Sequence, residues 1–188
     1  MPYLRRPPRK RAVPPKEPPA FASPAAFLPY NVPVSDVLSR PAILIGTEAS
    51  LFDAMVLMRT HGVTGLPVID ASGAVVGVLS QKDLARLVAG SSAFPAITGV
   101  LDVLMAGLGD QPNVTMRRLR RLLEQTRVRE VMSSPALVIR PSATLEFAAQ
   151  VMRENDINRL PVVEDDRLIG VVTRSDLLRA LIPAEATA

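Results

Sequence analysis

A serine or threonine followed three residues later by an aspartate occurs twice in the sequence, each time directly after an apolar run. The first copy, GVLSQKD, contains Ser80 and Asp83, and the second copy, GVVTRSD, contains Thr173 and Asp176. This spacing is typical of a helix N-terminus, where hydroxyl and carboxylate satisfy free backbone N–H groups. An ionised aspartate can also accept two hydrogen bonds from a vicinal diol, as acidic residues do on ribose. From the motif alone, a helix cap and a ligand site both remain open.

The two copies of the motif close a longer internal repeat. The stretch that begins at Val34 resembles the stretch that begins at Val128, with one residue fewer in a turn of the second copy. In each copy a short apolar run, at residues 42–45 or 136–139, precedes a helical pattern, two β-type runs and a second helical pattern. The sequence therefore predicts the order strand, helix, strand, strand, helix, in duplicate.

The first helix of each repeat is expected to begin after Ser50 or Thr144, which are good N-cap residues. Its apolar residues recur at helical spacing and predict the face that packs into the core. They are Leu51, Ala54, Met55 and Met58 in the first repeat, and Leu145, Ala148, Val151 and Met152 in the second.

Composition limits the chemistry that the chain can perform. With 188 residues, 48% hydrophobic and 21% charged, the chain has globular composition. It contains no cysteine, which excludes disulfides, thiolate metal sites and cysteine nucleophiles. A single histidine, His61, argues against most zinc and triad chemistry, and we expect it to be a solvated or capping residue at a helix end. No apolar stretch is long enough to span a bilayer, so we expect a soluble cytoplasmic protein. Because the sequence shows no nucleophile–base pair, metal cluster or phosphate loop, we do not expect an enzyme.

The positive charge of the chain lies in an N-terminal tail. Residues 1–33 hold six of the basic residues and one acidic residue, together with ten of the eighteen prolines. Proline at this density disfavours helix and sheet, so residues 1–32 are expected to be disordered. The tail is either a solvated leader or a segment that docks on a protein partner through Phe21, Phe27 and Tyr30.

Residues 91–127 separate the two repeats and predict a helical insertion. VTMRRLRRLLEQ gives an amphipathic helix with Met116, Leu119, Leu122 and Leu123 facing inward. Its opposite face carries Arg117, Arg118, Arg120 and Arg121. This basic face is either a solvated helix surface or a surface that binds an anion or a partner.

Three features recur in both repeats: the Val-x-Asp/Glu-Val-Leu/Met opening, the Leu-Pro-Val strand and the Gly-x-x-Ser/Thr-x-x-Asp ending. With these features the chain resembles a tandem pair of CBS domains, the regulatory module named after cystathionine beta-synthase. The resemblance implies an α/β (α+β) fold in which two repeats form one module with pseudo-twofold symmetry. We place the tail at 1–32, the first repeat at 33–90, the insertion at 91–127, the second repeat at 128–183 and the C-terminal end at 184–188.

In that family the closing motif holds the ribose of an adenine nucleotide, and the resemblance implies two composite sites. The adenine of the nucleotide at Asp176 would lie against the opening segment of the first repeat. The adenine of the nucleotide at Asp83 would lie against the opening segment of the second repeat. The residues concerned are Leu38, Ala42 and Ile43 for the first of these nucleotides, and Met132, Ala136 and Leu137 for the other.

The glycine before each motif is expected to leave room for the ligand. Phosphate would be held by Arg159, which precedes Leu160 and Pro161, together with Thr173 and Ser175. In the first repeat Gly65 and Lys82 take the places of Arg159 and Ser175, with Ser80 in the place of Thr173. The guanidinium of Arg159 can bind a phosphate through two parallel hydrogen bonds (bidentate binding). We therefore expect the Asp176 site to bind the nucleotide more tightly than the Asp83 site.

The leading interpretation is a regulatory, energy-sensing module that binds AMP, ADP or ATP, changes conformation and controls a partner protein. S-adenosyl methionine or a cyclic dinucleotide are alternative ligands. We expect a homodimer, because a single module is predicted to bury apolar positions of its outer helices, such as Leu51, Met55 and Leu145, only incompletely. The alternative is a ligand-independent dimeric adaptor that displays the tail to a protein or to nucleic acid. Binding of nucleic acid through the tail and the basic helix fits less well with a nearly neutral folded part.

Overall fold

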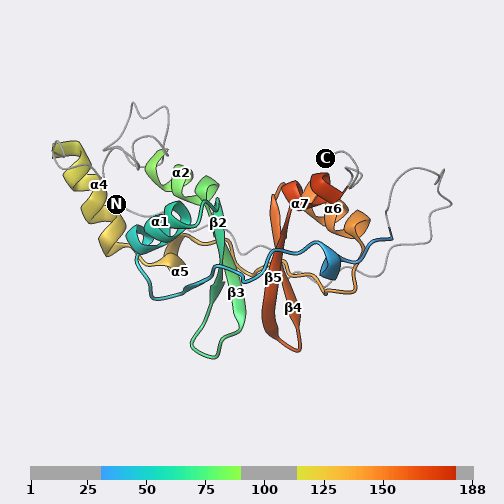
Figure 1. Cartoon of the computed structure of the whole chain (residues 1–188). Coiled ribbons are helices and arrows are strands. Elements are labelled where there is room, and N and C mark those ends of the chain that lie inside the picture. The colour runs from blue at the N-terminus through green and yellow to red at the C-terminus, as the bar shows by residue number, and fades with distance from the viewer. Residues whose placement is uncertain (1–30, 90–113, 181–188) are drawn as a thin grey trace. The chain divides into compact units, whose positions relative to one another are not determined.

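A computed structural model describes residues 31–89 and 114–180 (Figure 1). These residues form two compact units, which we name after the aspartate that each contains. The Asp176 unit comprises residues 31–40, 137–164 and 170–180, and the Asp83 unit comprises residues 41–89, 114–136 and 165–169. Each unit is thus built mainly from one repeat and takes its opening segment from the other.

The Asp83 unit contains a three-stranded sheet in the order β1-β2-β3. The strands are β1 (Ile45–Gly46), β2 (Gly65–Ile69) and β3 (Val75–Ser80). The central strand β2 is parallel to β1 and antiparallel to β3, with Leu66 opposite Leu79. Both of these leucines are fully buried, so this pair lies in the core of the unit.

Helix α1 (Leu51–Thr60) begins at the predicted residue. Ser50 accepts a hydrogen bond from the backbone N–H of Asp53 at 3.0 Å, and the Asp53 carboxylate accepts from the backbone N–H of Ser50 at 3.3 Å. This reciprocal capping box satisfies two backbone donors at the helix start. The buried residues of α1 are Leu51, Ala54, Met55 and Met58, which confirms the predicted core face.

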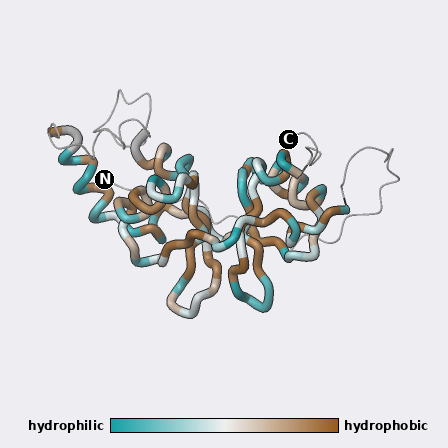
Figure 2. The backbone as a smooth tube through the Cα atoms, viewed as in Figure 1, coloured by the Kyte–Doolittle hydropathy of each residue, from teal (hydrophilic) through white to brown (hydrophobic). Residues whose placement is uncertain are grey.

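Two further helices complete the Asp83 unit around its core. Helix α2 (Gln81–Ala89) follows β3 directly, and α4 (Val114–Gln125) packs against α1 (Figure 1). Leu119 and Leu123 of α4 are 2% exposed, which confirms the inward face predicted for this helix. Figure 2 shows hydrophilic and hydrophobic stretches alternating along α4, as an amphipathic helix requires. The side chain of Met116 and the earlier part of the insertion lie outside the described residues.

The Asp176 unit repeats the same pattern with a smaller sheet. It contains the 3-10 turn η1 (Val34–Asp36), α6 (Leu145–Glu154), the paired strands β4 (Arg159–Glu164) and β5 (Arg167–Thr173), and α7 (Arg174–Ala180), although the first three residues of β5 are counted with the Asp83 unit. Thr144 accepts a hydrogen bond from the backbone N–H of Phe147 at 3.2 Å and so begins α6 as predicted. The buried residues of α6 are Leu145, Ala148, Val151 and Met152, again the predicted face.

The opening segments cross between the repeats through backbone pairing. In the Asp176 unit, Ser39 pairs antiparallel with Val171 and Pro33 pairs with Thr144. In the Asp83 unit, Ser133 pairs antiparallel with Val78, and Val128 belongs to the core at 0% exposure. The short helix α5 (Val128–Val131) leads into this segment.

Two details differ from the sequence-based expectations. The apolar run at 136–139 forms an isolated parallel bridge between Ile139 and Val162 rather than a strand. Leu51, Met55 and Leu145, which we expected a single module to bury only incompletely, are 0%, 8% and 6% exposed. They point into the core of their own unit, so they do not provide the apolar surface that we had assigned to a dimer.

Candidate functional site

The motif residues of the Asp83 unit form a compact hydrogen-bonded cap at the junction of β3 and α2. The backbone N–H and the hydroxyl of Ser80 both donate to Oδ2 of Asp83, at 3.0 and 2.6 Å. The backbone N–H of Asp83 in turn donates to Oγ of Ser80 at 3.4 Å. Asp83 is 6% exposed, so the strand-to-helix turn holds a carboxylate at a nearly buried position.

The motif of the Asp176 unit has the same geometry at the junction of β5 and α7. The backbone N–H and the hydroxyl of Thr173 donate to Oδ2 of Asp176 at 2.8 and 2.6 Å, and the backbone N–H of Asp176 donates to the Thr173 hydroxyl oxygen at 3.3 Å. Asp176 is 5% exposed. In both units the cap interpretation of the motif is therefore realised in the structure.

The second carboxylate oxygen, Oδ1, faces different groups in the two units. Oδ1 of Asp176 accepts a hydrogen bond from Nη1 of Arg179 at 3.2 Å. Oδ1 of Asp83 accepts from the hydroxyl of Ser133 at 3.2 Å and lies 3.8 Å from Nη1 of Arg86. Both arginines stand three residues after their aspartate, one helical turn along, and their side chains are largely exposed.

The glycine before each motif serves the close approach of the opening segment. A Cβ on Gly77 would lie 2.6 Å from Sδ of Met132 and 3.0 Å from the backbone oxygen of Ser133. A Cβ on Gly170 would overlap the side chain of Leu38 and lie 2.9 Å from the backbone oxygen of Ser39. The space that we had assigned to a ligand is thus filled by side chains of the chain itself.

The residues expected to contact adenine divide between the two units. Leu38 lies in the Asp176 unit, beside Gly170, and Met132 and Ala136 lie in the Asp83 unit, beside β3. Ala42 and Ile43 fall in the unit opposite to Asp176, and Leu137 falls in the unit opposite to Asp83. All six side chains are half-buried.

The residues expected to contact phosphate lie near the start of the final helix. The backbone N–H of Arg174 donates to the backbone oxygen of Asn158 at 3.0 Å, which brings Arg159 close to the Thr173–Asp176 motif. Burial lowers the pKa of the Arg159 guanidinium below its ordinary value. Ser175 is exposed, whereas Leu160 and Pro161 are buried in β4. In the Asp83 unit the backbone N–H of Gln81 donates to Thr64, beside Gly65, and Lys82 is exposed.

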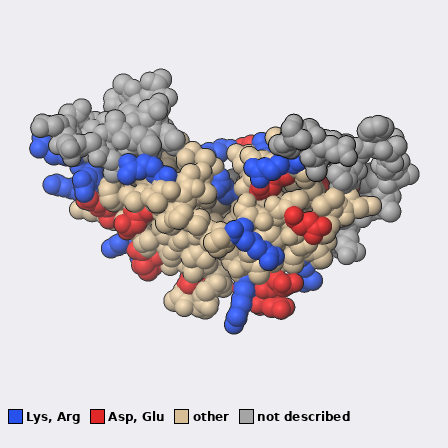
Figure 3. Space-filling model, viewed as in Figure 1, with Lys and Arg blue, Asp and Glu red and all other residues tan. Residues whose placement is uncertain are grey.

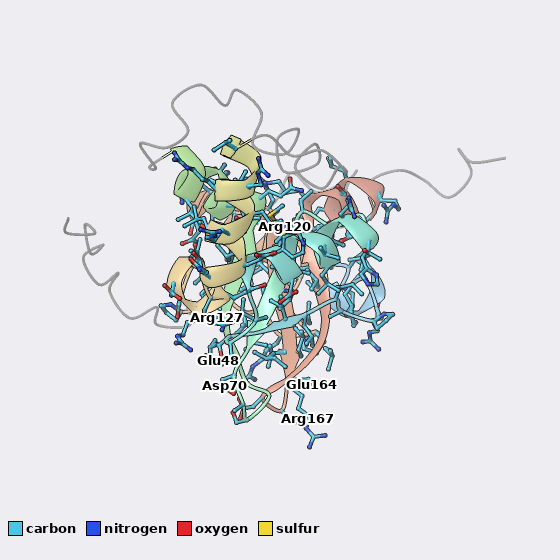
Figure 4. The ribbon with its side chains drawn as sticks, turned by 90° about the vertical axis from the view of Figure 1, so that its left-hand side faces the viewer. Glu48, Asp70, Arg120, Arg127, Glu164 and Arg167 are labelled. Carbon is cyan, nitrogen blue, oxygen red and sulfur yellow. The ribbon has the colours of Figure 1, made fainter. Side chains whose placement is uncertain are left out.

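The basic face of α4 is exposed, as both interpretations of the sequence require. In the space-filling view, Lys and Arg side chains gather over α4 (Figure 3). Arg120 forms an ion pair with Glu124 at 2.8 Å and lies 5.0 Å over the Phe52 ring, and Figure 4 shows it on the α4 side of the molecule. Arg117, Arg118 and Arg121 are exposed.

Other predicted features are placed as follows. His61 is exposed and caps the C-terminus of α1, as expected of a capping residue. Among residues 31–89 and 114–180, no group of three or more His, Asp or Glu side chains could hold a metal ion. In the same ranges, no helix has the length and apolar character needed to cross a membrane. Phe21, Phe27 and Tyr30 lie outside the described residues.

Sequence reasoning missed Ser133, Arg86 and Arg179, the residues that contact Oδ1 of the motif aspartates. The two arginines could have been found from their spacing, because residues three apart on a helix are neighbours. Ser133 gave no such signal, because it lies fifty positions from Asp83 and its role depends on the exchange of opening segments.

Comparisons with known proteins agree with this architecture. The family model described as CBS domain matches residues 34–90 and 128–183. The chain is 32% identical over 158 residues to protein MJ1426 of Methanocaldococcus jannaschii, covering 79% of this chain and 90% of the relative. It is 35% identical over 143 residues to the chloroplastic CBS domain-containing protein CBSX2 of Arabidopsis thaliana, of which it spans 58%.

Solved structures show the same fold. The CBS domain of a membrane protein from Sphaerobacter thermophilus superposes with a TM-score of 0.66 at 26% identity, covering 81% of this chain and 90% of that one. The structure of CBSX2 in complex with AMP gives a TM-score of 0.55 at 32% identity, covering 79% and 94%. With two family matches, an internal repeat and a duplicated Ser/Thr-x-x-Asp cap, the chain belongs to the CBS domain family as a tandem pair.

Proposed function

We propose that the protein is a regulatory module that binds an adenine nucleotide, with Asp176 accepting hydrogen bonds from the ribose hydroxyls. The observation that carries this proposal is the placement of Asp176. Its Oδ2 is committed to the cap, while its Oδ1 is held by the side chain of Arg179, which is 75% exposed. The Arg179 end of this ion pair lies in solvent, so its guanidinium can be hydrated when a diol takes its place at Oδ1 of the buried Asp176.

Neighbouring residues fit the rest of such a ligand. Arg159, half-buried at the start of β4, supplies a guanidinium for a phosphate close to the same motif, and Ser175 supplies an exposed hydroxyl. The Thr173 hydroxyl donates its proton to Asp176 and would have to release the cap to contact the phosphate. The complex of the relative CBSX2 with AMP supports an adenine nucleotide as the ligand class. AMP, ADP and ATP are the proposed ligands, with S-adenosyl methionine and cyclic dinucleotides as alternatives for the same ribose contact.

The proposal assigns the protein a regulatory rather than an enzymatic role. The absence of cysteine and the single histidine of the sequence support this assignment. Binding would change the relative populations of conformations and so alter a surface that a partner recognises. We keep the homodimer and a partner that docks on the N-terminal tail as parts of the proposal. A ligand-independent dimeric adaptor remains the competing function.

Calorimetric titration with AMP tests the proposal. We expect Asp176→Ala to weaken binding by about 10- to 150-fold, the equivalent of a charged hydrogen bond of about 1.5 to 3 kcal/mol. Asp83→Ala is the matched control, because it removes the same cap from the other unit. Equal AMP affinity in the wild type and in Asp176→Ala would contradict ribose binding at Asp176, and a wild type that takes up no nucleotide at all would favour the adaptor.

A second titration tests whether Asp176 recognises the ribose hydroxyls of the nucleotide. 2′-Deoxy-AMP lacks one hydroxyl of the diol and should bind to the wild type more weakly than AMP does. In Asp176→Ala the two nucleotides should bind alike, because the acceptor that distinguishes them is gone. A preference for AMP that persists in Asp176→Ala would place the ribose contact elsewhere.

A further inference from the structure

The two motif aspartates differ in how much of each carboxylate the protein itself uses. We infer that the Ser133 hydroxyl closes Asp83 to a ribose diol, so that each chain holds one nucleotide, at Asp176. This inference rests on the proposed function, because it concerns which of the two motif copies binds the nucleotide. It assigns Ser133 as a residue that determines the stoichiometry, a role that the motif itself does not predict.

The argument begins with the acceptor capacity of a carboxylate, whose two oxygens each offer about two lone pairs. In both units Oδ2 accepts two hydrogen bonds from the cap, at 3.0 and 2.6 Å for Asp83 and at 2.8 and 2.6 Å for Asp176. Oδ2 is therefore saturated in each case. A diol with two hydroxyl donors must find both of its acceptors on Oδ1.

At Asp176 those acceptors become available when one mobile side chain moves. Arg179 donates to Oδ1 at 3.2 Å, but its side chain is 75% exposed and makes no other hydrogen bond or ion pair within residues 31–89 and 114–180, so it can turn into solvent. The ion pair then gives way to the two hydroxyl donors of the ribose.

At Asp83 one acceptor of Oδ1 is taken by a group with little freedom. The Ser133 hydroxyl donates to it at 3.2 Å. The backbone of Ser133 is fixed to Val78 by two hydrogen bonds, at 2.9 and 3.0 Å, so its Cβ stays in place and only a rotation about χ1 can turn the hydroxyl away from Asp83. Arg179, in contrast, can swing its whole long side chain into solvent. The guanidinium of Arg86, at 3.8 Å, faces the same oxygen. One acceptor is left, which does not suffice for a diol.

The serine at the matching position of the other unit behaves differently. Ser39 has the same backbone pairing, with Val171, at 2.9 and 3.3 Å. Its side chain is exposed, and within the described part of the chain its hydroxyl makes no hydrogen bond to Asp176. The two units thus share the backbone arrangement and differ in the direction of one hydroxyl group.

The experiment is a calorimetric titration of the full chain with AMP, read as the number of molecules bound per chain. We expect one for the wild type, two for Ser133→Ala and one for the matched control Ser39→Ala. A wild type that binds two AMP per chain, or a folded Ser133→Ala that still binds one, would overturn the inference while leaving the proposed function intact. A wild type that binds no AMP would overturn the proposed function first.

A second variant keeps the test decisive if Ser133→Ala does not fold. Asp83→Asn alters the carboxylate that we consider closed, and we expect it to leave both the stoichiometry and the affinity for AMP unchanged. A loss of bound AMP, or a tenfold weaker affinity in Asp83→Asn with an unchanged circular dichroism spectrum, would show that Asp83 binds nucleotide and would contradict the inference.

Discussion

The Asp83 unit and the Asp176 unit carry the same backbone plan with different side chains at the points where a ligand would bind. Each has a capped aspartate, a preceding glycine and a serine paired across from the motif strand. They differ where Gly65 replaces Arg159 and where Ser133 turns toward its aspartate while Ser39 does not. The duplicated pattern therefore specifies the cap and the packing, and we propose that the few side chains that differ between the units decide what each copy binds.

The glycines should give the largest effect on stability. Gly170→Ala and Gly77→Ala each force a methyl group against the opening segment, which we expect to cost about 1 to 3 kcal/mol of unfolding free energy. Gly170→Ala should cost more, because its Cβ would overlap the side chain of Leu38, whereas the Cβ on Gly77 would lie 2.6 Å from the flexible thioether of Met132. The nearest backbone oxygens are about equally close in the two units, at 2.9 and 3.0 Å. Chemical denaturation measures both. Unchanged stability in both variants would break the view that the glycines allow close packing of the chain on itself.

The helix caps at Ser80 and Thr173 should contribute nearly equally to the stability of their units. Ser80→Ala and Thr173→Ala each remove an N-terminal cap, and we expect both to lose about 0.5 to 2 kcal/mol of unfolding free energy. The hydrogen-bond geometry is nearly the same in the two motifs, so the losses should agree. Denaturation curves provide the test, with Ser175→Ala as a control for an exposed hydroxyl of the same motif. A clear difference between the two losses would show that the units do not share one local structure.

Ser133 and Ser39, which occupy matching positions in the two units, should differ by a smaller amount in their contribution to the free energy of unfolding. Ser133→Ala removes a hydrogen bond to a carboxylate, and we expect a loss of about 1 kcal/mol. Ser39→Ala changes an exposed side chain and should remain within about 0.5 kcal/mol of the wild type. Thermal melts of the two variants decide the point. If both variants matched the wild type, the contact between Ser133 and Asp83 would contribute nothing to the fold.

The smallest expected difference between the units concerns their hairpin turns. It is a difference in how the stability of each turn depends on pH. In the β2–β3 turn, Asp70 accepts hydrogen bonds from the Ser72 hydroxyl and from the backbone N–H groups of Ser72 and Ala74. The Ser72 hydroxyl, as the main cause, holds the pKa of Asp70 below its ordinary value. Figure 4 shows Asp70 near the end of this hairpin and Arg167 near the end of the β4–β5 hairpin.

Because the folded-state pKa of Asp70 is lowered, its contribution to stability is present above the unfolded-state pKa. That contribution is lost as the pH falls through the folded-state pKa. An NMR titration should therefore find an Asp70 pKa below that of an unperturbed aspartate, and Ser72→Ala should return it toward the ordinary value. The β4–β5 turn is built differently, from Asp165 and Asp166 with φ angles of 47° and 60°. A normal Asp70 pKa would remove this distinction between the hairpins.

The sequence predicted much of the fold for identifiable reasons. Ser50 and Thr144 are good caps followed by amphipathic patterns, and the eight apolar residues expected on the two helix faces are the buried ones. These signals are local, so the sequence contains them directly. The expectation that one module buries Leu51, Met55 and Leu145 only incompletely was wrong, because helical spacing identifies an apolar face but not which neighbour covers it.

The candidate site was predicted less completely. The cap of Asp176 follows from residues three positions apart, whereas the contact of Ser133 with Asp83 joins residues that only the fold brings together. For the same reason, the sequence could not show that Leu38 and Met132 fill the space beside the glycines. Which side chains meet across a non-local pairing depends on register and rotamer, and neither is encoded in a short motif.

The exchange of opening segments means that neither half of the chain is a transplantable module. A fragment that ends at residue 89 would keep β3 but lose Ser133, the backbone partner of Val78, and Val128, a fully buried part of the same core. A fragment that begins at residue 128 would in turn lose Val34 and the Ser39 partner of Val171. A fusion or recombination that moves one copy into another protein would therefore have to carry residues 128–136 or 33–40 from the other copy with it.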